Sequence, residues 1–122
     1  MRPEDRDAAS LLDALEAAKR IITYVEGMSL EDYIASDLKR AAVERELTVI
    51  GEALNRLSQA ARNANPNIAI PAIVGLRNRI IHEYEWIEDD RIFSIVKVQV
   101  PELIDLLVRL IPPIPPDPEP EE

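Results

Sequence analysis

The side chains best suited to chemistry lie in one short segment, residues 75–86. It contains Arg77 and, five positions later, His82, which is the only histidine of the 122-residue chain. An imidazole titrates near neutral pH, so it can move the proton of a 2′-hydroxyl or of a leaving group. A guanidinium presents a fixed fork of donors that can hold a phosphate and offset charge developing in a transition state. This pair therefore suits metal-independent cleavage of RNA.

Arg77 occupies an unusual place in the helical pattern of this segment. At about 100° per residue it falls in the middle of an apolar arc, which is formed by Ile73, Val74, Leu76, Ile80 and Ile81. An arginine in such a place is costly unless it is paired or faces a partner or a cleft. Two interpretations stay open: a structural ion pair, with Glu44 or Glu52 as the carboxylate, or a phosphate-binding role.

His82 lies about 140° around an ideal helix from Arg77, so the two side chains do not share one face. Either the helix distorts near its end, or each motif meets its counterpart from another subunit. A two-fold interface built on this helix would bring two arginines and two histidines into one cleft. Taken alone, His82 can also be interpreted as a helix cap or a surface residue.

Two long helices are predicted before this segment, over residues 5–26 and 36–63. Their apolar residues recur at alternating short spacings, namely at Leu11, Leu15, Ala18, Ile22 and Val25, and at Val43, Leu47, Ile50, Leu54, Leu57 and Ala61. Gly27 should end the first helix, and Ser29 with Asp32 resembles a capping box that starts a short helical turn. The short link between the long helices predicts an antiparallel hairpin.

Two further helices complete the predicted fold. Pro71 suits the first position of a third helix that ends near His82. Asp89–Asp90 open a last helix, in which Pro101 should cause a kink. The predicted fold class is therefore all-α, a single-domain bundle of four to five helices with antiparallel long helices.

Residues 1–111 form the predicted domain, and residues 112–122 form a proline-rich acidic tail that we expect to be extended and mobile. The formal charge of the chain is −9, and removal of the four acids of the tail leaves −5. Nucleic-acid binders are usually basic. Any contact with RNA is therefore expected to be local, without tight non-specific binding.

The composition excludes several kinds of site. The chain has no cysteine, and its single histidine excludes a multi-histidine zinc site within one chain. We expect neither a metal nor a cofactor. The longest apolar stretch, residues 68–76, is too short to cross a membrane, and the first ten residues lack the apolar region of a signal peptide. The chain is therefore expected to be cytoplasmic, with no membrane contact.

The segment Arg77-Asn78-Arg79-Ile80-Ile81-His82 resembles the Arg-x4-His signature of HEPN ribonucleases, including the polar residue after the arginine. With Glu83-Tyr84 it extends to Arg-x4-His-x-Tyr, which is similar to the HepT branch of toxin–antitoxin systems. The upstream run Ala42-Val-Glu-Arg-Glu-Leu-Thr-Val-Ile-Gly-Glu-Ala53 is similar to the long second helix of that branch. The resemblance covers residues 5–110. In two respects the chain departs from the pattern, because Glu83 stands where many relatives carry a small residue and the acidic tail is additional.

The resemblance implies a helical homodimer with both motif copies lining a shared cleft. It implies that Arg77 and His82 are catalytic, that Asn78 supports them, and that RNA, either tRNA or mRNA, is cut by attack of the 2′-hydroxyl. The implied partner is a small MntA-like nucleotidyltransferase antitoxin that transfers AMP to Tyr84. Added phosphate beside the cleft would repel RNA and compete for Arg77. Among the three tyrosines, only the resemblance favours Tyr84.

Three hypotheses follow from these observations. The first is a ribonuclease toxin that is neutralised through Tyr84. The second, motivated by the acidic charge and by Glu83, is a catalytically weak helical module that serves as scaffold and substrate for the nucleotidyltransferase. The third is a purely structural helical dimer, in which Arg77 contributes to stability alone.

Overall fold

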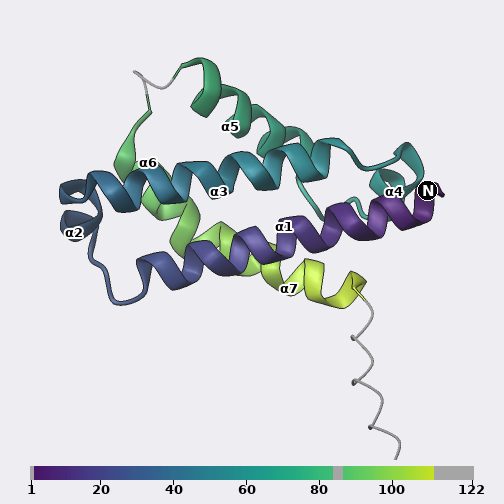
Figure 1. The fold of residues 1–122 in the computed structure, drawn as a ribbon, viewed down its shortest axis with the longest axis horizontal. Helices are drawn as coiled ribbons and strands as arrows, with labels where there is room; N and C mark the ends of the chain where they lie inside the picture. The colour runs from purple at the N-terminus through teal and green to yellow at the C-terminus, as the bar shows by residue number, and fades with distance from the viewer. Residues whose placement is uncertain (1, 84–86, 112–122) are drawn as a thin grey trace, which may run out of the picture.

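The computed structural model describes residues 2–83 and 87–111, and every regular element in these residues is helical. The α-helices are α1 (Pro3–Val25), α2 (Leu30–Ala35), α3 (Asp37–Asn55), α4 (Gln59–Ala64), α5 (Ile70–His82), α6 (Asp89–Ser94) and α7 (Val100–Leu110). The long helices α1, α3, α5 and α7 are packed antiparallel to their neighbours (Figure 1). The predicted all-α class is therefore confirmed, with three short helices added to the four long ones.

Helices α1 and α3 form the predicted antiparallel hairpin at the centre of the molecule (Figure 1). Their apolar stripes supply most of the buried core, with Leu11, Leu15, Ala18 and Val25 from α1 and Val43, Leu47, Ile50 and Leu54 from α3. Gly27 adopts a positive φ of 73° directly after α1, a conformation that glycine adopts without strain. The predicted capping box is also present, because Ser29 and Asp32 satisfy each other's backbone N–H groups at the start of α2.

The predicted end of the second long helix, near Asn63, is wrong. Helix α3 ends at Asn55, and α4 begins after the cap residue Ser58. The Ser58 hydroxyl accepts a hydrogen bond from the Ala61 N–H at 3.1 Å and donates one to Asp7 of α1 at 2.6 Å. A serine that binds local backbone in this way competes with continuous helix, so the chain turns where apolar spacing alone predicts that it continues.

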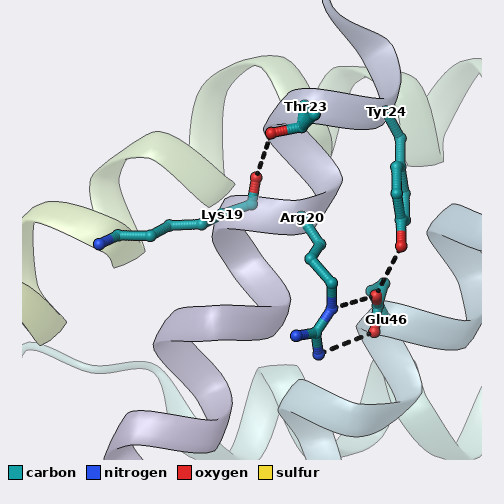
Figure 2. Close-up of polar contacts among 5 residues, drawn as sticks. All are labelled: Lys19, Arg20, Thr23, Tyr24 and Glu46. Atoms are coloured by element: carbon teal, nitrogen blue, oxygen red, sulfur yellow. Dashed lines mark hydrogen bonds and ion pairs between the residues drawn. The ribbon is translucent and has the colours of Figure 1, made fainter.

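A partly buried polar cluster ties α1 to α3. Glu46 of α3 accepts hydrogen bonds from Arg20 and from the Tyr24 hydroxyl, the latter at 3.2 Å (Figure 2). Burial, together with the hydrogen bond to Glu46, raises the pKa of Tyr24. A buried carboxylate needs such partners, because an unpaired charge in the core is strongly unfavourable. The Tyr24 hydroxyl therefore has a structural role in the α1–α3 contact.

The last helical segment is interrupted next to its proline. A π-helical turn, Ile95–Gln99, joins α6 to α7, and the Val100 N–H donates to the carbonyl of Ile95. Pro101, in the first turn of α7, has no N–H to donate, so the backbone pattern can change there at small cost. The sequence predicts a kink at Pro101; the structure has a π-helical turn just before this proline, at Ile95–Gln99. Within the residues that the structure describes, no helix has both the length and the apolar character that a bilayer crossing requires.

Candidate active site on helix α5

Helix α5 carries Arg77, Asn78 and His82 and is α-helical at every position from Ile70 to His82. Pro71 lies in its first turn, as predicted, and the Glu83 N–H closes its last turn on the carbonyl of Arg79 at 2.8 Å. A regular helix directs residues five apart to positions about 140° apart. Of the two interpretations for His82, distortion of the helix is therefore not observed. Arg77 and His82 leave α5 in different directions.

Arg77 leaves α5 on the side that faces α3, and its stem packs close to Gly51. A Cβ atom added to Gly51 would lie 2.4 Å from the Cβ and 2.8 Å from the Cγ of Arg77. Real Cβ atoms do not approach other carbons so closely, so Gly51 is required for this contact. The stem of Arg77 is thereby packed against the backbone of α3.

Two neighbours hold the guanidinium of Arg77. Its Nη1 donates to the Asn78 side-chain oxygen at 2.8 Å, and its Nη2 lies 3.4 Å from a carboxylate oxygen of Glu52. The Arg77 side chain is 28% exposed and that of Glu52 is 46% exposed, so this ion pair lies at the surface end of the seam between α3 and α5. The position of Arg77 in the apolar arc is explained by its ion pair with Glu52. Glu52 is one of the two carboxylates that the sequence offered as partners. Asn78 lies against Arg77, as the polar residue that would support it.

His82 is exposed at the end of α5, beside the exposed side chain of Ile81. Glu83, which follows it, lies 3.8 Å from Arg79 in an exposed ion pair one helical turn apart. That contact directs Glu83 toward Arg79. Tyr84, the predicted modification site, lies outside the described residues, as does the predicted tail.

The connection from α5 to α6 is anchored at its far end by a second ion pair. Arg40 of α3 donates to Asp89 at the start of α6 at 3.1 Å. Beside this pair, burial first and the Asp89 charge second raise the pKa of Glu44, while Arg40 opposes the shift. Burial also raises the pKa of Tyr33, whose ring is fully buried. This junction of α2, α3 and α6 fixes where the chain returns after His82.

A separate groove lies on another flank of α5. It is a groove of about 630 Å³ between α5 and the segment from α6 to α7, with Ile73, Leu76, Ile95 and Leu103 among its lining residues and Arg79 and Arg91 as its basic ones. Neither Arg77 nor His82 is among the described residues that line it. A mostly apolar groove does not suit a phosphate, so this groove is not the candidate site.

The importance of Gly51 was missed by the reasoning from sequence. A signal was present, because an isolated glycine inside a strongly helical run costs about 1 kcal/mol and usually has a packing reason. The partner that this glycine admits, Arg77, lies 26 positions away along the chain. Spacing within one helix therefore could not identify it.

Comparisons with known proteins place the chain in a family of ribonucleases. Residues 14–110 match the family described as "Ribonuclease HepT-like". The chain is 36% identical over 95 residues to "Putative RNase MJ1380" of Methanocaldococcus jannaschii, covering 78% of this chain and 87% of that protein. It is 32% identical over 109 residues to "Putative RNase MJ0127" of the same organism, covering 89% of this chain and 90% of that protein.

A third relative carries the family's own name. The chain is 27% identical over 93 residues to "Probable ribonuclease HepT" of Thermococcus cleftensis, covering 76% of this chain and 84% of that protein. No solved structure matches the chain significantly. The family match spans α3 and α5, and thus both sides of the seam that holds Arg77. This chain belongs to the HepT-like ribonuclease family.

Proposed function

We propose that this chain is a metal-independent endoribonuclease toxin that acts as a homodimer. The observation that carries the proposal is the regularity of α5, which directs Arg77 and His82 about 140° apart. A single chain therefore does not present both groups on one helical face. A two-fold interface on α5 would supply the histidine of one protomer to the arginine of the other. The exposed Ile81 beside His82 gives such an interface an apolar contact.

The proposed reaction needs no metal. His82 would move the proton of the attacking 2′-hydroxyl or of the leaving oxygen, since an imidazole titrates near neutral pH. Arg77 would hold the scissile phosphate and offset the charge that develops on it, and Asn78 would orient the guanidinium. The RNA substrate is either tRNA or mRNA.

The proposed partner is an MntA-like nucleotidyltransferase antitoxin that transfers AMP to Tyr84. The environments of the other two tyrosines support this choice, because both are poorly placed for modification. The ring of Tyr33 is fully buried, and the Tyr24 hydroxyl donates a hydrogen bond to Glu46. Phosphate added next to His82 would repel RNA and compete for Arg77. Mass spectrometry of the co-expressed pair should find AMP adducts on Tyr84, and adducts confined to Tyr24 or Tyr33 would exclude this switch.

Cleavage in the presence of EDTA is the test of the enzymatic proposal. The purified, unmodified protein should cut RNA with excess chelator present, and His82→Ala should reduce the rate by about a hundredfold or more. Arg79→Ala, which changes a neighbouring cation on another flank of α5, is the matched control and should keep most of the activity. Cleavage that survives His82→Ala would remove His82 from the mechanism.

A second function has one observation in its favour. The Arg77 guanidinium already has an anionic partner in Glu52, which suits a catalytically weak module that serves as scaffold and substrate for the nucleotidyltransferase. This alternative predicts AMP transfer to Tyr84 but no RNA cleavage by the unmodified protein. Expression of the wild-type chain alone separates the two, because only the toxin should arrest growth.

A further inference from the structure

We propose that Glu52 is a positioning residue, which holds the Arg77 guanidinium in the orientation that catalysis needs while competing with RNA for it. This inference rests on the proposed function, since it assigns a role within the same site. Glu52 itself does not touch the reacting atoms. Its contribution acts through Arg77, so it should change turnover more than it changes binding.

The first support is the way in which Gly51 and Glu52, adjacent on α3, divide the contact with one arginine. Gly51 admits the stem of Arg77, at distances that any Cβ atom would prevent. Glu52 meets the guanidinium at the outer end of the same side chain, with 3.4 Å between Nη2 and the carboxylate oxygen. The stem and the head of Arg77 are therefore both located by α3, although the residue belongs to α5.

The second support is the number of donors that remain free. A guanidinium has five N–H groups. Nε is buried without a hydrogen-bond partner among the described residues, while one Nη1 donor goes to Asn78 and one Nη2 donor goes to Glu52. One N–H on each terminal nitrogen has no partner among the described residues, and a phosphate could accept hydrogen bonds from both. Asn78 and Glu52 would thus turn this free pair outward from the seam.

The third support is the negative charge of Glu52. Glu52 is a carboxylate that is 46% exposed beside the place where a phosphate would bind. Two anions near one guanidinium repel each other, so Glu52 should weaken the binding of RNA slightly. A purely structural ion pair makes no such prediction, because its loss would lower stability and impair binding and turnover together. The direction of the change in KM therefore distinguishes the two roles.

The decisive experiment compares Glu52→Gln, Glu52→Asp and Glu16→Gln with the wild-type protein. Glu52→Gln should lower kcat by about tenfold to a hundredfold, since small errors in orientation have effects of that size, while KM stays equal or falls. Glu52→Asp keeps the charge and should recover part of kcat. Glu16→Gln removes one charge from an exposed, mid-helix glutamate of α1 and should match the wild type in both constants. An unchanged kcat for Glu52→Gln, or a fall in kcat accompanied by a higher KM and a lower Tm, would overturn the assignment.

A measurement without RNA keeps this inference separate from the proposed function. The ¹⁵N signals of the Arg77 guanidinium, assigned by their loss in Arg77→Lys, should show hindered rotation in the wild type and faster rotation in Glu52→Gln. Equal rotation in both proteins would refute the positioning role of Glu52, whether or not the protein cuts RNA. If the wild type and Glu16→Gln both fail to cut RNA while the hindered rotation is present, the proposed function would be refuted. Only the contact by which Glu52 restrains the Arg77 guanidinium would then stand.

Discussion

Three carboxylates of this chain each have a specific partner in the structure. Glu46 accepts hydrogen bonds from Arg20 and Tyr24 at the contact of α1 and α3. Glu52 forms an ion pair with Arg77 at the surface, and Asp7 accepts a hydrogen bond from Ser58 between α1 and α4. The core carboxylate fixes the hairpin, since removal of one member would leave the other without compensation. The surface pair is screened by water, so its value lies in orientation more than in stability.

Asp7 provides a pH-dependent test at the scale of a single residue. Hydrogen bonds from the hydroxyl and the N–H of Ser58 lower the pKa of Asp7, although burial opposes the shift. A lowered pKa in the folded state means that the stabilisation is complete above the ordinary pKa, near pH 4, and is lost as the pH falls through the lowered value. Asp7→Asn should therefore lower Tm at pH 7, and the difference from the wild type should shrink as the pH falls below about 4, as measured by thermal unfolding from pH 7 downward.

An exposed aspartate of α7, Asp105, serves as the control for this prediction. Asp105→Asn should follow the wild-type curve at every pH, because this side chain is exposed on the surface of α7. A difference in Tm between Asp7→Asn and the wild type that stays the same as the pH falls would show that the side chain acts through something other than its charge.

At the scale of elements, the contact between α3 and α5 determines where Arg77 lies. Gly51→Ala would bring a Cβ within 2.4 Å of the Cβ of Arg77, so α5 would have to move away from α3. We expect a loss of about 1–3 kcal/mol in the free energy of unfolding, as for other overpacked contacts, together with reduced RNA cleavage. Denaturant unfolding measures the first effect and a cleavage assay the second.

Gly75 offers a matched control on α5 itself. A Cβ at Gly75 would meet nothing within 4 Å, so Gly75→Ala should stabilise the helix by up to about 1 kcal/mol through propensity alone. If the two alanine variants were equally stable, the close approach of α3 and α5 would not constrain the fold.

The elements that the sequence predicted well are those whose signals are local. The stripe of α1, the turn at Gly27 and the capping box at Ser29 depend on residues a few positions apart. The break before α4 was missed because Ser58 takes its second partner, Asp7, from 51 positions away. For the same reason the pattern within α5 located Arg77 in an apolar arc but left its ion-pair partner open.

At the scale of the whole molecule, the charge of −9 and the divided site lead to one expectation. An acidic chain does not gather RNA by long-range attraction, so activity must come from a small local cluster of donors. A two-fold dimer would double that cluster by joining two copies of α5. The proposed cleft is therefore a property of the assembly more than of the chain.

Mixing of inactive variants tests this expectation directly. Arg77→Ala and His82→Ala protomers should each be inactive alone, whereas an equal mixture after subunit exchange should regain about a quarter of the wild-type rate. Half of the dimers would be mixed, and each mixed dimer would have one complete site of its two. Cleavage assays before and after exchange supply the measurement, and a mixture that stays inactive despite exchange would place both groups of a site in one chain.

Helix α5 is attached to the rest of the molecule by few buried side chains. Only Ile70 among its residues is fully buried, whereas α1 and α3 bury their stripes along most of their length. Local opening costs least where the fewest apolar contacts are broken. Amide hydrogens of α5 should therefore exchange with deuterium sooner than those of α1, and the difference should shrink as protein concentration rises and a second chain covers the helix. The helix that bears the proposed catalytic residues would then be the one whose amide protection depends most on contact with a second protomer.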